Sequence, residues 1–196
     1  MAPNAPQCLP DLLRSIRACT ACADLPLGPR PILQASETAR ILIAGQAPGQ
    51  RAHIGGIPFA DASGQRLRAW LGLADHVFYD SSRVAIAPMG FCFPGTGASG
   101  DMPPRPQCAA LWRERLLERL AAVRLTLVIG SYATAWHLPG DKRPLTALAR
   151  DWQCRWPELV VLPHPSPRNN RWLKANPWFE EEVLPPLRRR VAELIG

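Results

Sequence analysis

Short, continuous apolar runs alternate along the chain with segments in which apolar residues recur every three or four positions. Four such runs occupy residues 40–45, 82–92, 125–130 and 158–163. Runs of this kind are typical of strands that are buried on both faces of a parallel sheet. Because the strands alternate with helical segments, the pattern predicts an α/β fold, a three-layer α/β/α arrangement around a central, mostly parallel four-stranded sheet.

Helices are predicted where the apolar positions follow a period near 3.6 residues. These segments lie near 9–16, 63–71, 108–123, 131–138 and 176–196. Ser63 is expected to cap the second helix. In the third, Leu111, Leu116 and Leu120 are expected to face the core. The last segment contains two adjacent prolines, which should kink it.

The composition favours a single domain over residues 1–196. The chain has 47% hydrophobic residues and no long low-complexity linker, so it can bury one sizeable core. No stretch approaches the roughly 20 apolar residues of a membrane span, and the first residues lack the apolar centre of a signal peptide. We therefore expect a cytoplasmic monomer with no membrane partner.

The charge of the chain suggests a polyanionic partner. Its 23 Lys and Arg residues exceed its 16 Asp and Glu residues, which gives a formal net charge of +7. Clustered Lys and Arg side chains release counterions from phosphates when they bind nucleic acid. Basic proteins without such a partner are about equally common, so charge alone leaves both interpretations open.

Turn-forming and polar residues follow three of the predicted strands, at 45–49, 88–92 and 164–170. In parallel α/β sheets, ligands bind beyond the carboxyl ends of the strands, so these turns are the expected site. In the last of them His164 follows the strand directly, and the neighbouring prolines stiffen the backbone.

Two of these turns carry motifs that resemble those of the uracil-DNA glycosylase superfamily. Residues 45–64, GQAPGQRAHIGGIPFADASG, are similar to the family-4 pattern in which a Gly-Glu-Ala-Pro-Gly turn (motif A) leads to Gly-x-Pro-Phe and then Ala-Gly. Residues 164–169, HPSPRN, are similar to motif B of the single-strand-selective monofunctional uracil glycosylases. The resemblance extends from about Cys19 to Leu187.

The resemblance implies a DNA partner, single- or double-stranded, and base excision by a monofunctional hydrolase. The nucleotide is flipped out of the stack, water cleaves its N-glycosidic bond, and an abasic site remains. Uracil is the implied base, with other deaminated bases as further substrates. No diffusible cofactor is needed.

The resemblance also implies roles for individual residues. Phe59 would stack on the flipped base, the backbone amides of Gln46 and Ala47 would face the base carbonyl and the attacking water, and His164 would donate a hydrogen bond to the departing base. Residues after motif B, such as Arg168, Asn169 or Leu173, would fill the gap left in the DNA helix. The expected substrate-binding residues are Gly45, Gln46, Ala47, Pro48, Gly49, Phe59, Met89, Ser166, Arg168 and Asn169.

Motif A departs from the family pattern because it contains no carboxylate. Family 1 has an Asp at the third position of the motif and family 4 has a Glu at the second, where this chain has Ala47 and Gln46. His53 and Asp61, in the following loop, are substitute candidates for water activation, so that the expected catalytic set is His164, Gln46, His53 and Asp61. Positioning of the water without a base also suffices if the transition state is dissociative.

Recognition of the base departs from the family pattern as well. Related enzymes place an Asn after the second strand to bind the edge of uracil, and this chain has Pro88 and Met89 there. Either backbone groups bind the base edge, or an apolar pocket discriminates weakly between similar bases.

Four of the six cysteines form two pairs that can share one site. Cys19 and Cys22 form a Cys-x2-Cys pair, while Cys92 and Cys108 stand at the two ends of a segment rich in Gly and Pro. Four thiolates can hold an iron-sulfur cluster or a zinc ion, and the absence of any metal is the third alternative. Because the spacing resembles the cluster ligands of family-4 enzymes, the resemblance favours a structural 4Fe-4S cluster.

Two other functions are compatible with these residues. The first is a non-catalytic protein that binds damaged or single-stranded DNA in a glycosylase-like pocket, which the missing motif A carboxylate makes reasonable. The second is an iron-sulfur or zinc protein that acts on free nucleosides, against which the basic residues after motif B argue.

Overall fold

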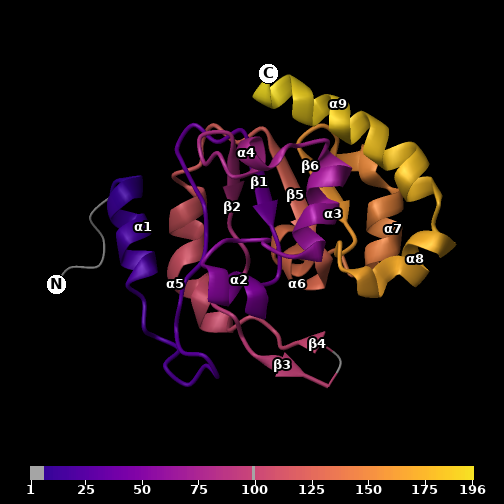
Figure 1. Cartoon of the computed structure of the whole chain (residues 1–196). Coiled ribbons are helices and arrows are strands. Elements are labelled where there is room, and N and C mark those ends of the chain that lie inside the picture. The colour runs from indigo at the N-terminus through magenta and orange to yellow at the C-terminus, as the bar shows by residue number, and fades with distance from the viewer. Residues whose placement is uncertain (1–6, 99) are drawn as a thin grey trace.

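The centre of the protein is a four-stranded parallel sheet. The computed structural model describes residues 7–98 and 100–196, and Figure 1 shows the sheet surrounded by helices. The strands are β1 (Ile41–Ala44), β2 (Val84–Ile86), β5 (Leu125–Ile129) and β6 (Leu159–Leu162). Their spatial order is β2-β1-β5-β6, and every neighbouring pair is parallel. The predicted three-layer α/β/α fold is confirmed.

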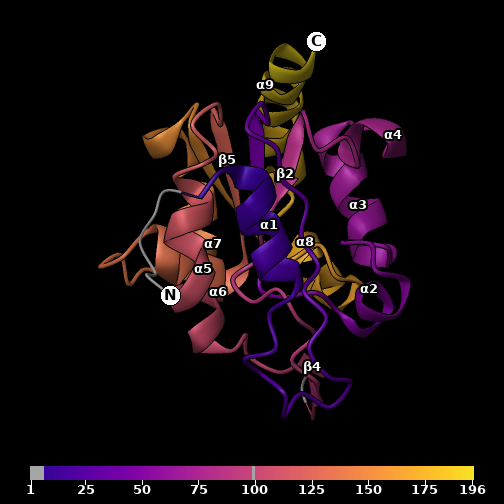
Figure 2. The same ribbon diagram turned by 90° about the vertical axis from the view of Figure 1, so that its left-hand side faces the viewer.

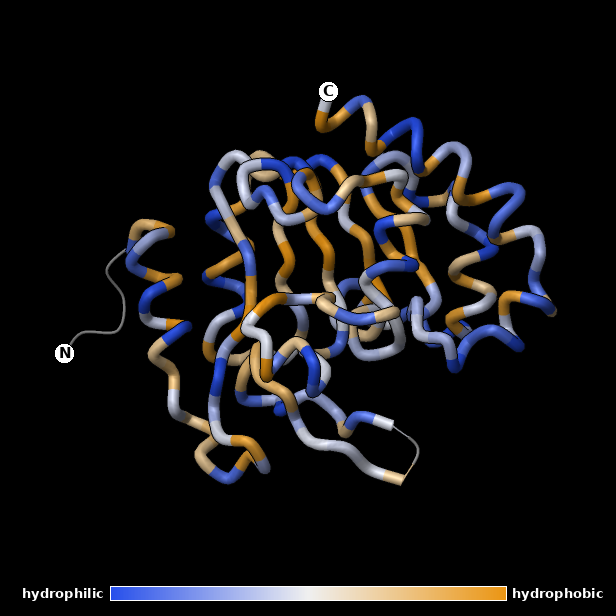
Figure 3. Tube along the Cα trace, in the orientation of Figure 1, coloured by the Kyte–Doolittle hydropathy of each residue, from blue (hydrophilic) through white to orange (hydrophobic). Residues whose placement is uncertain are grey.

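Helices cover both faces of this sheet because successive strand residues point to opposite sides and both sides are apolar. Ile41 and Ile43 face α3 (Ala62–Leu71), α4 (Asp75–Phe78) and α9 (Leu184–Ile195). Leu42 and Ala44 face α1 (Leu9–Arg17), α5 (Pro106–Leu117), α6 (Gly130–His137) and α7 (Leu145–Arg150). Figure 2 views the sheet from the side of α1 and α5, and Figure 3 shows that the strands are among the most hydrophobic segments.

The remaining elements are short and lie mainly around one end of the sheet (Figure 1). They are α2 (Gln50–Gly55), the strands β3 (Thr96–Gly97) and β4 (Gly100–Asp101), the turns η1 (Trp152–Arg155) and η2 (Pro167–Asn169), and helix α8 (Asn170–Ala175). The antiparallel hairpin β3–β4 belongs to the segment between Cys92 and Cys108, for which the sequence predicted turns alone. No helix of the described part of the chain is long and apolar enough to cross a membrane.

Two details of the predicted helices are corrected by the structure. Helix α3 is capped by Asp61 rather than Ser63, because the Asp61 carboxylate accepts a hydrogen bond of 2.9 Å from the Gly64 amide. In α5, Leu116 is buried as predicted, but Leu111 is 44% exposed. The other buried side chain of this helix is that of Arg113. The periodicity misassigned Leu111 because an arginine takes a position on the inner face of this helix.

The last predicted helix is divided by its prolines. Residues Phe179–Val183 form a π-helical turn, η3, and α9 begins at Leu184 with Pro185 and Pro186 in its first turn. A proline is tolerated there because the first amides of a helix have no partner within the helix. The expected interruption therefore takes the form of a wider turn directly before the prolines.

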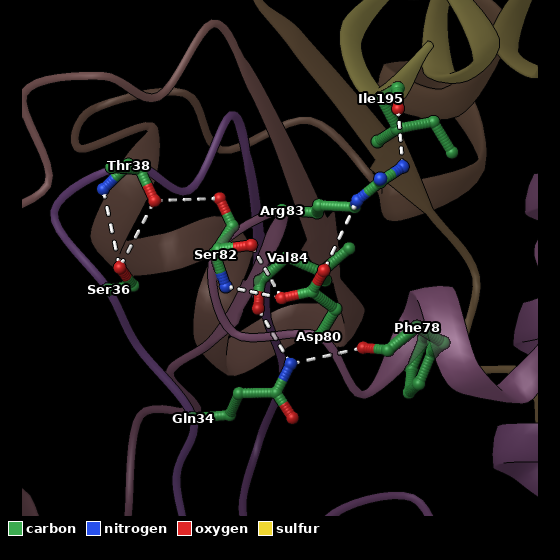
Figure 4. A network of polar contacts seen from close by, with 9 residues as sticks. All are labelled: Gln34, Ser36, Thr38, Phe78, Asp80, Ser82, Arg83, Val84 and Ile195. Carbon is green, nitrogen blue, oxygen red and sulfur yellow. Dashed lines mark hydrogen bonds and ion pairs between the residues drawn. The ribbon is translucent and has the colours of Figure 1, made fainter.

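A network of polar contacts fastens the amino end of the sheet, shown in Figure 4. The Gln34 side-chain amide donates to the carbonyl oxygens of Phe78 and Val84, at 3.0 and 2.7 Å. Arg83 donates to the carbonyl of Ile195 at 2.6 Å and so holds the end of α9. The amino end of the sheet is thus stabilised by hydrogen bonds within the chain, while the carboxyl end carries the turns with the candidate site residues.

Candidate active site

A cleft of about 570 Å³ lies beyond the carboxyl ends of β1, β2 and β6. In parallel α/β sheets this is the end at which ligands bind. The cleft brings motif A, the loop after it, the turn after β2, the β3–β4 hairpin and motif B to one place. Its lining includes residues 45–49, Arg51, Phe59, Asp61, Ile86, Pro88, Gly100, Asp101, His164, Ser166, Arg168 and Asn169.

The motif A turn presents two backbone amides to this cleft. The carbonyl oxygens of Gly45 and Gln46 accept hydrogen bonds from the amides of Met89 and Gly90, at 2.8 and 2.9 Å, which joins the turns after β1 and β2. Within the described residues, the amides of Gln46 and Ala47 donate to no protein group. Unpaired amides at such a turn are suited to bind an oxygen of a ligand or a water.

Phe59 lies in the cleft with a backbone conformation that is rare for a side chain of its kind. Its φ is +55°, and it is the only non-glycine residue in the described chain with a positive φ. The end of its ring approaches Gly45, 3.7 Å from the position that a Cβ would take there, and its edge contacts Phe78. The aromatic ring thus lies against the motif A turn.

The conformation of Phe59 is maintained by three contacts of its backbone. Its carbonyl oxygen accepts hydrogen bonds from the Tyr79 hydroxyl at 3.3 Å and from the Arg68 guanidinium at 3.4 Å. Gly64 lies directly beneath, where a Cβ would overlap the same carbonyl oxygen and stand 2.7 Å from the Phe59 Cβ. Only glycine at position 64 leaves room for this loop.

His164 points into the cleft in a defined tautomer. Its Nδ1 accepts a hydrogen bond of 3.2 Å from the Ser166 amide, so that the neutral ring carries its proton on Nε2. Burial lowers the pKa of His164 below its ordinary value of 6.5, while the carboxylates of Asp61 and Asp101 act in the opposite direction. At pH 7 the ring is therefore neutral and offers one N–H donor.

The motif B loop that carries His164 is closed by its own side chains and by α3. The Asn169 amide donates to the His164 carbonyl at 2.7 Å, and the Ser166 hydroxyl accepts from the Arg168 amide at 3.2 Å. Arg66 of α3 donates to the Ser166 carbonyl at 3.1 Å. Ser166 and Asn169 thus line the cleft and also shape the loop, while the Arg168 side chain extends over Gly100 of the hairpin.

Three further predicted site residues have distinct surroundings. Asp61 lines the cleft, but one of its oxygens caps α3. His53 is buried against Phe93 and is absent from the cleft lining, and its Nδ1 has no hydrogen-bond partner. Met89 packs in the core with Ala44 and its neighbours, while Pro88 lines the cleft in its place.

The turn after β2 is held from behind by Arg113, which the sequence did not indicate. This buried guanidinium donates to the carbonyl oxygens of Ala87 and Pro88, at 2.8 and 3.1 Å, and contacts His137. Burial lowers the pKa of Arg113 to about 10 and that of His137 to about 4. Because Pro88 has no amide and its carbonyl is bound, this wall presents mainly an apolar surface to the cleft.

Asp101 is a residue of the cleft lining that the sequence interpretation missed. It belongs to β4 of the hairpin, and its carboxylate lies close to Gly49 of motif A. A usable signal was present, since Asp101 is the only acidic residue between Cys92 and Cys108. Without the hairpin geometry, nothing in the sequence connects this residue to motif A.

The four paired cysteines line a second, smaller cavity together. Cys19, Cys22, Cys92 and Cys108 surround it with Trp112 and several apolar residues. Burial raises the pKa of the Cys92 and Cys108 thiols to about 11, and the neighbouring cysteines act in the same direction. Within residues 7–98 and 100–196, no three His, Cys, Asp or Glu side chains converge closely enough to hold a single ion.

Comparison with known proteins identifies the family. Residues 33–188 match the model of the uracil DNA glycosylase superfamily, a span that includes the sheet, the cleft and both motifs. The solution NMR structure of a provisionally assigned uracil DNA glycosylase from Methanosarcina acetivorans has 17% sequence identity and a TM-score of 0.47, over 82% of this chain and 98% of that chain. Because the family model covers most of the chain, the protein belongs to the uracil DNA glycosylase superfamily.

Proposed function

We propose that the protein removes uracil from DNA by hydrolysing its N-glycosidic bond and leaves an abasic site. One observation carries this proposal: His164, the free amides of motif A and the ring of Phe59 line the same cleft at the end of the sheet. These are a hydrogen-bond donor, a binding position for oxygen and a stacking surface. Together they can hold one planar base and stabilise the charge that develops on it.

In the proposed reaction the base is flipped into the cleft and stacks on Phe59. As the bond between the sugar C1′ and the base nitrogen breaks, its electron pair moves to the base. The Nε2–H of His164 donates to the base oxygen on which negative charge accumulates, and water bonds to C1′ and releases a proton. One preorganised donor of this kind contributes roughly 3 to 4 kcal/mol to lowering the barrier.

Basic residues around the cleft support DNA as the substrate rather than free nucleosides. Arg51 and Arg168 line the cleft, and Arg171 and Lys174 are exposed on α8 directly after motif B. They are suited to bind the phosphates on either side of a flipped nucleotide. Arg168 and Asn169 are the candidates for filling the gap in the DNA stack, because Leu173 packs against the core.

The proposed base range includes uracil and other deaminated bases. Ile86 and Pro88 form the wall where related enzymes carry an Asn, and the amides of Met89 and Gly90 are already bound to motif A. A wall without a free donor or acceptor cannot strongly reject a base of similar shape.

The function is tested with oligonucleotides that contain one uracil, in single- and double-stranded form. After incubation with the protein and treatment with alkali, strand breaks at the uracil position are expected, and an oligonucleotide with thymine at that position serves as the control. Tight binding without breaks would support the alternative of a non-catalytic DNA-binding protein. Release of the base only from free nucleosides would support the alternative of an iron-sulfur or zinc protein that acts on nucleosides.

We further propose that Cys19, Cys22, Cys92 and Cys108 hold a 4Fe-4S cluster. The donor set fits, because four thiols surround one cavity and come from two distant segments. The spacing of the two cysteine pairs resembles that of the cluster ligands in family-4 enzymes, which favours a cluster over zinc. The cluster would supply no reaction chemistry here, and the cysteines would fasten both ends of the segment that carries the β3–β4 hairpin.

Metal analysis tests this proposal. The purified protein is expected to contain about four iron atoms per chain and to absorb visible light. Cys108→Ala should lose most of the iron, while Cys154→Ala, at an exposed cysteine outside the set, should retain it. One zinc per chain would support the zinc alternative, and a protein with no metal that keeps its fold would contradict both.

A further inference from the structure

Two carboxylates reach the motif A turn from other parts of the chain. The Oδ2 atoms of Asp101 and Asp61 lie 3.5 and 4.0 Å from the point where a Cβ at Gly49 would stand. Both side chains line the cleft together with His164. Motif A has no carboxylate of its own, and Asp61 and Asp101 are the acidic residues among the described residues that line the cleft.

The two aspartates differ in what else their side chains do. Asp61 precedes α3 and binds the Gly64 amide at 2.9 Å, so that it stabilises the start of a helix. The Asp101 carboxylate forms no hydrogen bond or ion pair with any other described residue. It is exposed on the cleft side of a hairpin, where water can reach it.

Gln46 fixes the position of Asp101. Its side-chain amide donates to the carbonyl of Met102 at 2.9 Å and more weakly to that of Asp101 at 3.4 Å. The hairpin is also closed by the Met102 amide, which donates to Gly95 at 2.8 Å. A glutamine at the second position of motif A therefore holds the strand that brings a carboxylate to the same turn.

We propose that Asp101 is the residue that activates water, and that Gln46 is its positioning residue. This inference rests on the proposed glycosylase function. As the glycosidic electron pair leaves with the base, an oxygen lone pair of the water forms the bond to C1′, and a water proton passes to the Asp101 carboxylate. The β3–β4 hairpin thereby supplies the group that motif A lacks.

The test compares single-turnover rates of uracil release by the wild type, Asp101→Asn, Asp61→Asn and Asp11→Asn. Asp101→Asn keeps the size of the side chain but removes the base, so its rate should fall by about 100-fold or more. Its affinity for DNA with a non-hydrolysable uracil analogue should change by less than about threefold. Asp11→Asn, on the outer helix α1, is the matched control and should keep the wild-type rate.

Rescue by azide distinguishes two reasons for a slow Asp101 variant: the loss of the group that accepts the water proton, and a change in the shape of the cleft. Azide needs no deprotonation, so in Asp101→Ala its electron pair can form the bond to C1′ directly as the base leaves. We expect azide to restore base release in this variant and to yield an azido sugar detectable by mass spectrometry. Rescue by azide is expected if the variant lacks only the group that activates water, whereas a distorted cleft would not be repaired by it.

Four results would overturn the assignment. An Asp101→Asn rate within threefold of the wild type would remove Asp101 from the mechanism, as would a large rate loss confined to Asp61→Asn. An Asp101→Ala variant that azide fails to rescue would assign the residue a structural role. A wild-type protein that releases no uracil would overturn the proposed function and this inference together, whereas the first three results leave the function intact.

Discussion

Replacement of His164 by alanine is expected to lower the single-turnover rate of uracil release by about 100- to 1000-fold. The variant loses the Nε2–H that faces the cleft, a donor whose orientation is fixed by the bond from the Ser166 amide to Nδ1. Substrate affinity should change little, because the hydrogen bond strengthens only as charge develops on the base. Rapid-quench kinetics on a uracil oligonucleotide, with binding measured in parallel, will give both quantities.

His76→Ala is the matched control for this experiment. It removes an exposed imidazole on α4, outside the cleft, and should leave both rate and affinity unchanged. A His164→Ala rate within tenfold of the wild type would show that the base leaves without this donor. In that case the amides of motif A would be the main groups that stabilise the departing base.

The same geometry predicts the pH dependence of the wild type. Burial lowers the pKa of His164, so the ring is neutral at pH 7 and stays neutral as the pH rises. Acidification through the lowered pKa adds a proton at Nδ1, which would then face the Ser166 amide as a second donor. The contribution of His164 to the rate should therefore be constant above pH 6.5 and decline only as the pH falls through the lowered pKa of the ring.

Gly64→Ala is expected to have the largest effect on folding. The new methyl group would overlap the Phe59 carbonyl oxygen and come within 2.7 Å of the Phe59 Cβ, and backbone cannot move aside as a flexible side chain can. We expect a loss of roughly 3 kcal/mol or more in the free energy of unfolding. Variant molecules that fold should have a displaced ring and release uracil roughly 10- to 100-fold more slowly.

Chemical denaturation and the uracil assay measure these two effects. Gly55→Ala is the matched control, since a Cβ at this helical position meets no atom within 4 Å and should be neutral or slightly stabilising. A Gly64→Ala protein with unchanged stability and activity would contradict the packing of the Phe59 loop described here.

The strands and the two motifs could be predicted because their signals are local. Continuous apolar runs mark the four buried strands, and motif A and motif B each occupy a few consecutive residues. Both motifs line one cleft because the strands are parallel, and the carboxyl ends of parallel strands lie at the same end of the sheet. The general position of the site was therefore accessible from the chain alone.

What the sequence did not reveal depends on contacts between distant segments. Arg113 occupies an inner position of α5, where it donates hydrogen bonds to the carbonyls of Ala87 and Pro88. Helical periodicity of apolar residues cannot predict such a contact, because it considers one segment at a time. The approach of Asp101 to Gly49 depends on a hairpin held by the Gln46 side chain. Met89 turns into the core because its neighbour Pro88 takes the cleft side of the same turn.

The positive φ of Phe59 affects how a base would enter the cleft. Its loop is held by Tyr79, Arg68 and Gly64 before any ligand arrives, so the backbone that carries the ring loses its conformational freedom during folding and not during binding. Under the proposed function, a slot that is already formed would capture an extruded base without waiting for a loop to close. The speed of recognition would then be governed by how readily the DNA opens, so a uracil in a mismatch or an unpaired strand should be found sooner than one in a stable base pair.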